Sequence, residues 1–339
     1  MDASAKGIKA GTTLEGGSYT MDCSDDAFHA NGDVTVSGGA YTISTGDDGF
    51  HADETLTISD GQIDVVKAYE GLEGSNVDIQ GGEITIVSSD DGVNAAGGAD
   101  SSGFGGRGMD AFAPSDAFSD SSYSLTISGG SLNINASGDG LDSNGTITMT
   151  GGTVLVSSTG NGESALDYDR GFSLEGGVLM AAFASSMAQA PTDPGQYTLS
   201  VRFDSNLPAG TYVQFASENQ EFVFRLTATT NHIVFSSPEL ESGAVYSISY
   251  GGEYSGENNG GLCTGGTYSG GTLLTELTLS DYLTTYGRVG MGGSKGGNMI
   301  GEPGQRGSFG RGTEKPDGTF PDRSNGNDNG SMAGGKRGE

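Results

Sequence analysis

Carboxylate side chains recur at matched positions along the first half of this chain and are its most prominent source of chemistry. They belong to a stretch of sequence that is repeated several times. Most copies of this repeat begin with one acid or an acidic pair, and a polar residue follows three positions after the last of these acids. The candidate metal ligands are Asp25, Asp26, Asp47, Asp48, Glu70, Glu73, Asp90, Asp91, Asn94, Asp139, Asp142 and Asp167. Carboxylate and amide oxygens are the donors that Ca²⁺ prefers. The pattern therefore predicts calcium as a cofactor, against the simpler interpretation that Asp merely suits tight turns.

Two of the polar residues in this pattern are histidines, His29 and His51, each three positions after an acid. Imidazole suits calcium poorly, and the chain has no spaced Cys/His cluster of the kind that holds zinc. We therefore interpret both histidines as turn residues that hydrogen-bond to carboxylates.

The elements that position these acids follow from a repeat of about 22 residues. Its apolar column runs through Val34, Leu56, Val77, Leu125, Ile147 and Phe172. Each copy holds three short pairs of apolar residues at alternating positions, which indicates three strands with one buried face. Glycine pairs such as Gly38-Gly39 and Gly129-Gly130 mark a bend between the second and third pairs.

Three strands per copy predict an all-β fold, a right-handed parallel β-helix in which coils stack about 4.8 Å apart. Stacking brings the acids of successive coils close together, where like charges repel or hold protons. Something must therefore compensate them, and Lys67, Arg107 and Arg170 are too few.

The domain organisation follows from where the repeat begins, pauses and ends. We expect the β-helix over 6–186, interrupted by a Gly/Ser-rich insert at 97–122. Six strands separated by turn signals predict a small antiparallel β module over 187–286, which caps the solenoid and covers its strand edge. The Gly-rich segment 287–339 has few aliphatic residues, so we expect a disordered tail.

Composition excludes several classes of partner. There are 15 Lys and Arg against 44 Asp and Glu, a formal charge of −29, and eight of the basic residues lie in the tail. Such a body repels nucleic acid and attracts divalent cations. No apolar run is long enough to insert in a membrane, and we expect a monomer. The first coil, at Lys6, lacks a cap and no secretory signal is visible, so we expect a piece of a longer precursor that is extracellular or attached to the cell surface.

An ordered string of motifs between Lys6 and Tyr286 resembles a known family. The motifs are KGIKA at Lys6, DDGFHA at Asp47, YEGLEG at Tyr69, DDGVNA at Asp90, GDGLDSNGTITMTGG at Gly138, SALDYDRGFSLEGG at Ser164, SSMAQAP at Ser185, VFSSP at Val234 and CTGGTYSGG at Cys263. They resemble the bacterial surface carbohydrate-binding β-helix family, whose fold is similar to that of polysaccharide lyases. The resemblance implies calcium on the acidic turns and a cellulose- or pectin-like ligand. Two departures are Lys6, which implies no metal in the first coil, and Cys263, where the family pattern leads us to expect Tyr.

The residues leave three functions open. An acidic polysaccharide would be repelled unless calcium bridges carboxylate to carboxylate, whereas cellulose usually needs aromatic platforms, and the chain has no Trp while Tyr41 and Phe50 fall at inward positions. A calcium-dependent polyuronate lyase needs a base, for which Lys67 or Arg107 are candidates, although a surface charge is the simpler interpretation of Lys67. A purely structural adhesin or ice-binding solenoid is the third alternative, since outward threonines align except at Asp78.

Overall fold

The computed structural model describes residues 2–3, 6–9, 11–96, 123–160, 163–184 and 189–287. These residues form strands, turns and bends and include no helix, so they contain no helix that could cross a membrane. The all-β prediction is confirmed. The expected insert at 97–122 and the expected disordered tail after Gly287 lie outside the described residues.

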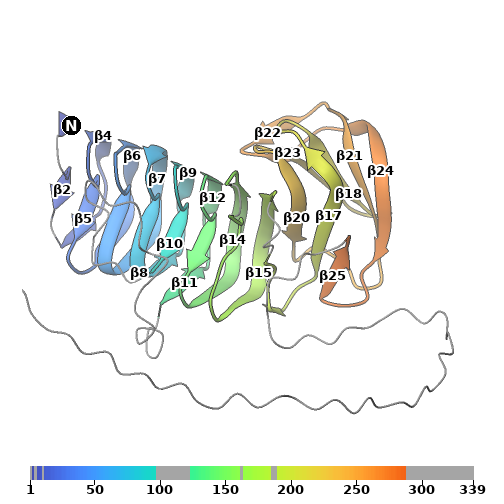
Figure 1. The fold of residues 1–339 in the computed structure, drawn as a ribbon, viewed down its shortest axis with the longest axis horizontal. Coiled ribbons are helices and arrows are strands. Elements are labelled where there is room, and N and C mark those ends of the chain that lie inside the picture. Colours follow the sequence, from blue (N-terminus) through green and yellow to red (C-terminus); the bar gives the residue numbers. More distant parts are fainter. Residues whose placement is uncertain are drawn as a thin grey trace, which may run out of the picture. The chain divides into compact units, whose positions relative to one another are not determined.

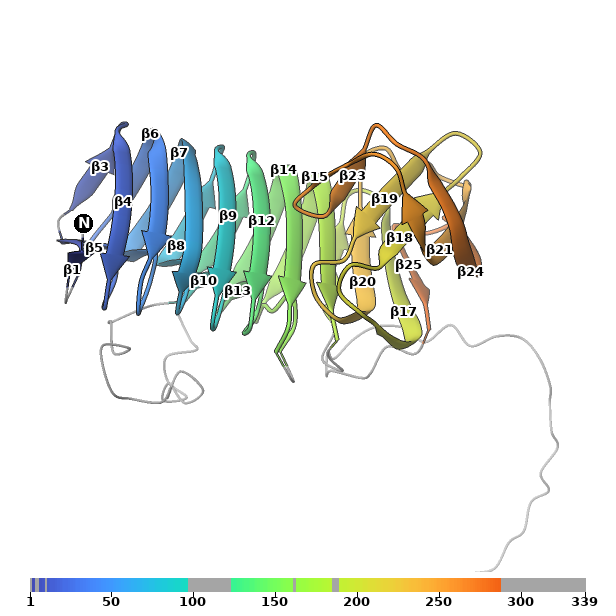
Figure 2. The ribbon, with the colours of Figure 1, turned by 90° about the horizontal axis from the view of Figure 1, so that it is seen from above.

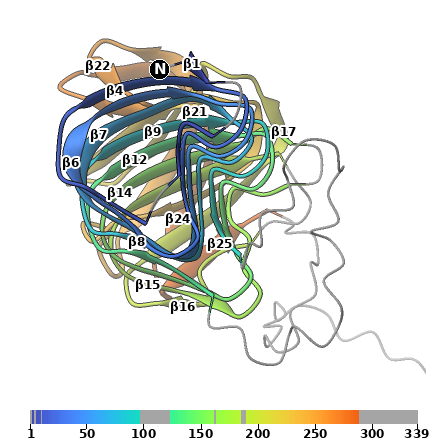
Figure 3. The ribbon, with the colours of Figure 1, turned by 90° about the vertical axis from the view of Figure 1, so that its left-hand side faces the viewer.

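The first fifteen strands wind into a parallel β-solenoid of about seven turns of roughly 22 residues (Figure 1). They are β1 (Asp2–Ala3), β2 (Ile8–Lys9), β3 (Thr12–Leu14), β4 (Ser18–Cys23), β5 (Phe28–Ala30), β6 (Val34–Ser44), β7 (Phe50–Ala68), β8 (Leu72–Ile79), β9 (Glu83–Ser88), β10 (Val93–Ala95), β11 (Ser124–Ile127), β12 (Ser131–Ala136), β13 (Leu141–Ser143), β14 (Thr146–Ser158) and β15 (Gly171–Phe183). Figure 3 looks along the stack and shows the coils superimposed on one another.

The register of the coils confirms the predicted repeat. Val34 pairs with Leu56, Leu56 with Val77, and Val77 with Leu125, so each strand residue lies beside its counterpart one coil away. The bend glycines adopt the left-handed conformation that the turn requires, with φ of 105° at Gly39 and 84° at Gly130. The inward apolar residues of successive coils therefore share one continuous core.

Aromatic side chains in the first coils stack with the same period. Phe28 and Phe50 lie parallel with ring centroids 4.7 Å apart, and Tyr19 lies 5.0 Å from Tyr41 in the same way. Tyr41 and Phe50 are fully buried, as their inward positions predict. Phe28, Tyr41 and Phe50 belong to the core, and the partly buried Tyr19 packs against it.

The remaining strands form the C-terminal part, which contains a six-stranded antiparallel sheet in the order β22-β23-β19-β18-β21-β24. The strands are β16 (Asp193–Pro194), β17 (Thr198–Leu207), β18 (Tyr212–Ala216), β19 (Glu221–Arg225), β20 (Thr230–Ser236), β21 (Val245–Tyr254), β22 (Glu257–Asn259), β23 (Leu262–Thr264), β24 (Tyr268–Thr278) and β25 (Leu283–Tyr286). The antiparallel sheet that the turn signals predict is therefore present.

Strand β20 pairs with the last coil of the solenoid. It runs antiparallel to β15, β17 runs antiparallel to β20, and β25 adds parallel to β17 (Figure 2). The outward residues Leu155 and Met180 of the last two coils become part of a second core with Phe215 and Phe235. Pairing and burial together cover the strand edge and one face of the terminal coils, which would otherwise invite association with another chain.

Candidate metal-binding site

The candidate ligands lie at one corner of each coil, in the turns before strands β5, β7, β8, β10 and β13 and in the first residues of these strands. The strand register aligns Phe28, Phe50, Leu72, Val93 and Leu141, so residues at fixed offsets from them form columns. The inner acid column, two residues earlier, contains Asp26, Asp48, Glu70, Asp91 and Asp139. The polar column, one residue later, contains His29, His51, Glu73, Asn94, Asp142 and Asp167.

The other predicted residues, Asp25, Asp47 and Asp90, precede the inner acid column by one position. Asp47 is buried, whereas Asp25 and Asp90 are partly exposed. All twelve predicted ligands thus lie along the same corner, and their role in binding metal stays a prediction.

Glycines hold the turns of successive coils close together. The Gly49 N–H donates to the Glu70 carbonyl at 3.0 Å, and the Gly92 N–H donates to the Asp139 carbonyl at 2.9 Å. A Cβ atom added at Gly49 would lie 2.5 Å from the Gly71 carbonyl oxygen. Because a side chain there would push the coils apart, these glycines are required for the close stacking of the carboxylates.

Gly92→Ala should therefore destabilise the fold. Its methyl group would lie 2.5 Å from the Gly140 carbonyl oxygen and would also clash with Ile134. We expect the free energy of unfolding to fall by about 1–3 kcal/mol, measured by urea denaturation. Gly32→Ala is the matched control, because nothing lies within 4 Å of a Cβ atom there. Equal stability of the two variants would contradict the tight stacking.

At the N-terminal end of the columns the chain supplies its own cation. The Lys6 ammonium lies 3.0 Å from a carboxylate oxygen of Asp25 and also forms an ion pair with Asp26. Asp26 in addition accepts a hydrogen bond from the Asp48 N–H at 3.3 Å. Lys6 thus occupies the place of an acid in the first coil and neutralises the acids of the second.

His51 has carboxylate partners on three sides. Its Nδ1 lies 3.0 Å from Asp48 and also contacts Glu73, while its Nε2 lies 3.1 Å from Asp53. Burial by itself lowers the pKa of His51, but the hydrogen bonds to Asp48 and Glu73 outweigh it and raise that pKa to about 11. His51 is therefore a cation at neutral pH. The sequence predicted that His51 bonds to a carboxylate of its turn. It did not predict the contact with Asp53, because Asp53 is not one of the acids of the repeated pattern.

The C-terminal end of the columns lacks such a cation. Among the described residues, no Lys or Arg forms an ion pair with Glu70, Asp91, Asp139, Asp142 or Asp167. Their partners are polar groups of the same corner: Asn94 Nδ2 donates to Glu70 at 3.1 Å, and the Asp139 N–H donates to Asp91 at 2.6 Å. Gln189 also bonds to Asp167, a contact that the sequence did not predict.

Burial makes these uncompensated carboxylates hard to ionise. Burial first, and then repulsion by neighbouring acids, raises the pKa of Asp91 to about 9 and that of Asp142 to about 8. Burial raises the pKa of Asp139 to about 7, and that of Glu70 well above its usual range. At neutral pH this half of the corner must bind protons or a metal ion.

Oxygen atoms are close enough here for one ion to bind several of them. Asp139, Asp142 and Asp167 offer carboxylate oxygens that all lie within 4.8 Å of one another. The buried Oδ1 of Asn94 has no hydrogen-bond partner among the described residues. An all-oxygen donor set of this kind fits a hard divalent cation such as Ca²⁺.

The residues considered for other functions lie elsewhere. Lys67, the candidate lyase base, is exposed, and Arg107 lies outside the described residues. Outward Thr57 and Thr126 flank Asp78 in register, so the threonine row is interrupted as predicted.

Comparison with known proteins gives one match. A family model described as "Carbohydrate-binding domain-containing protein" matches residues 1–49, which contain Lys6 and the first acidic turns. No curated protein and no solved structure matches the sequence. The narrower β-helix family suggested by the motifs stays a prediction. Over its first 49 residues, the chain is similar to a carbohydrate-binding domain.

Proposed function

We propose that this protein binds a polysaccharide with the help of calcium ions held by its acidic corner. The observation that carries the proposal is a set of carboxylates that are buried at Glu70 and partly buried elsewhere and that form no ion pair with Lys or Arg among the described residues. They are Glu70, Asp91, Asp139, Asp142 and Asp167. Calcium would replace the protons that these groups otherwise bind. The match to a carbohydrate-binding domain supplies the class of ligand.

An acidic, pectin-like polymer fits this surface better than cellulose does. The chain carries a formal charge of −29 and would repel a polyuronate unless calcium lies between the two sets of carboxylates. Cellulose binding usually relies on exposed aromatic rings, yet Tyr41, Phe28 and Phe50 are buried in the core. We also propose that the protein lies outside the cell or on its surface. Calcium is abundant enough there to fill sites of modest affinity.

The proposal is tested by affinity electrophoresis in gels that contain polygalacturonate, with calcium or with excess EDTA. We expect the protein to be retarded only with calcium. Fully methyl-esterified pectin is the matched control ligand, because it lacks the carboxylates that calcium would bridge. Retardation that persists in EDTA, or that is equal with the esterified polymer, would contradict the proposal. Ultraviolet absorbance of unsaturated products, measured in parallel in solution, would instead reveal a lyase.

A further inference from the structure

We propose that the polysaccharide lies on the outward face of β9, β12 and the last part of β7, where Lys67 binds one of its carboxylates. We call this surface the open face. Its residues are Val66, Lys67, Thr85, Val87, Asn133 and Asn135. This location rests on the proposed function and adds to it where the polymer binds. Calcium could bind at the acidic corner whether or not the polymer lies here, so the two can fail separately.

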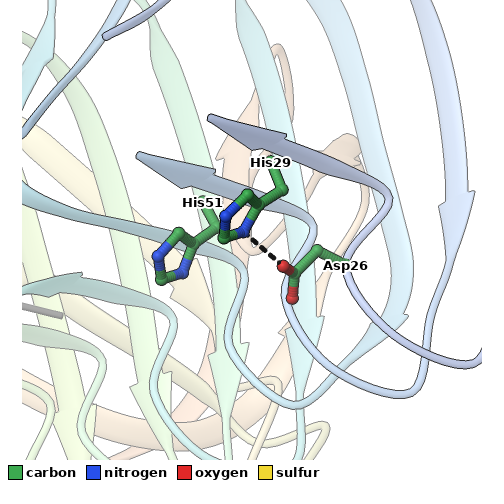
Figure 4. A group of neighbouring side chains, drawn as sticks. All are labelled: Asp26, His29 and His51. Carbon is green, nitrogen blue, oxygen red and sulfur yellow. Dashed lines mark hydrogen bonds and ion pairs between the residues drawn. The ribbon is translucent and has the colours of Figure 1, made fainter. Parts of the chain in front are cut away.

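The N-terminal half of the acidic corner has cations of its own. Lys6 forms an ion pair with Asp26, and His51 is charged among its carboxylate partners. Figure 4 shows the His51 ring beside that of His29, which lies against Asp26. The carboxylates without a Lys or Arg partner among the described residues belong to the later coils, from Glu70 onward. A polymer that calcium bridges to the protein would therefore lie beside those later coils.

Strands β9 and β12 lead directly into that part of the corner. β9 ends two residues before Asp90, and β12 ends three residues before Asp139. The two strands pair in parallel register, with Asn133 beside Thr85. The outward side of these strands therefore borders the carboxylates that would hold calcium.

A β-bulge exposes a cation at the corner end of the open face. Where β7 pairs with β9, Val66 and Lys67 together lie opposite Val87. Both Val66 and Lys67 are exposed, and Lys67 forms no ion pair with any described residue. Of the described Lys and Arg side chains, only Lys67 belongs to β7, β9 or β12. A carboxylate of a ligand on this face would therefore meet its one cation next to the corner.

The other side chains of the open face suit a sugar polymer. Val66 and Val87 are each 45% exposed, so the C–H groups of sugar rings can pack on them. Thr85, Asn133 and Asn135 are partly exposed, and their side chains form no hydrogen bond with other described residues, which leaves them available to ring hydroxyls. A uronate ring carries hydroxyls, C–H groups and a carboxylate, and the open face offers a partner for each.

Two acids on the outward side of the same strands limit the orientation of the polymer. Asp64 pairs with Thr85, and Glu83 is the first residue of β9. Both lie farther along their strands from the corner than Lys67 does, so a carboxylate would be repelled near them and attracted at Lys67. We therefore expect the carboxylates of the polymer to face the corner, where calcium would bind.

The C-terminal part of the chain closes the open face at one end. In the next two coils the residues in register with Asn133 are Leu155 and Met180, which are buried in the second core. The turn between β22 and β23 reaches Asn133 itself, since a Cβ atom added at Gly260 would overlap that side chain. The polymer would therefore lie against this hairpin and extend no farther along the solenoid.

Affinity electrophoresis of the full chain in saturating calcium, at several concentrations of polygalacturonate, gives the dissociation constants that test this location. We expect Lys67→Met to weaken binding about 2–5-fold and Lys67→Arg to bind as the wild type does. Val87→Glu should weaken binding by about 10-fold or more, because it places a negative charge where the carboxylate would lie. Val245→Glu is the matched control, since Val245 is 49% exposed on β21, outside the open face.

The calcium-dependent rise in melting temperature, measured without polymer, shows whether each variant still folds and binds calcium. If Val87→Glu does not fold, Lys67→Met and Lys67→Arg decide the matter. If the wild type is retarded and Lys67→Met and Val87→Glu bind as tightly as Val245→Glu, the location is wrong and the proposed function stands. Weaker binding that accompanies a smaller calcium-dependent rise would also overturn the location, because the change would then act through calcium. A wild type that polygalacturonate does not retard would overturn both.

Discussion

Asp142→Asn should lower the melting temperature in calcium but leave it unchanged or raised in excess EDTA. Without metal, Asp142 is a partly buried acid whose pKa is raised to about 8 by burial and by Asp167 and Asp139. Asn is neutral at every pH, so it avoids both the repulsion and the need to protonate this acid in the metal-free protein. With calcium, the same change removes a ligand. At a calcium concentration of 100 times Kd, binding stabilises by about 2.7 kcal/mol, or about 4–5 °C for a chain of this size.

Thermal melts in both buffers measure this effect, and we expect Asp142→Asn to lose at least half of the calcium-dependent rise. Asp204→Asn is the control, because Asp204 is exposed on β17, outside the acidic corner. Equal losses in calcium and EDTA would mean that Asp142 matters only for the geometry of its turn. The calcium proposal would then fail, although a neutral carbohydrate could still bind.

In EDTA, stability should fall as the pH rises from about 6.5 to 9. Asp91 holds its proton up to about pH 9 in the folded chain but only to about pH 4 when unfolded. The folded state therefore binds more protons across this window, and the free energy of unfolding decreases by about 1.4 kcal/mol per pH unit for each such proton. Saturating calcium should flatten the profile, because it replaces the protons.

Two other buried groups, both histidines, determine which pH range and which variant make this test specific. His232, whose pKa burial lowers to about 4, acts below pH 6.5 and with the opposite sign. His51 acts in the same direction as Asp91, because its folded pKa of about 11 lies above its unfolded value. Asp91→Asn isolates the contribution of Asp91, since it should reduce the slope in EDTA while His51 and the other acids remain. Urea denaturation at several pH values measures the slope, and a flat or rising profile in EDTA would contradict the assignment.

Much of the solenoid could be predicted from the sequence because its interactions repeat. Val34, Leu56 and Val77 recur at one interval, and each is buried against its counterpart one coil away. A strand residue in such a stack contacts mainly the equivalent residue of the next coil. Local alternation and a constant period are therefore sufficient to predict coils, bends and the columns of acids.

The C-terminal strands lack this regularity, so their pairing depended on the tertiary structure. Strand signals predicted an antiparallel module, but nothing in them indicated that β20 would pair with β15. Burial of Leu155 and Met180 under the module was equally hidden. In earlier coils the same column holds the polar, partly buried residues Asn133 and Thr85. Partners distant in sequence determine these contacts, and no repeat specifies them.

At the acidic corner, the sequence by itself determined which residues stack, and the tertiary structure decided their charges. The period alone places Asp26 beside Asp48 and His29 beside His51. Only the folded chain shows that Lys6 reaches Asp26 and that His51 also contacts Glu73. The reason is physical: the order of residues along a strand determines the columns, whereas a pKa depends on burial and on charges brought together from several coils.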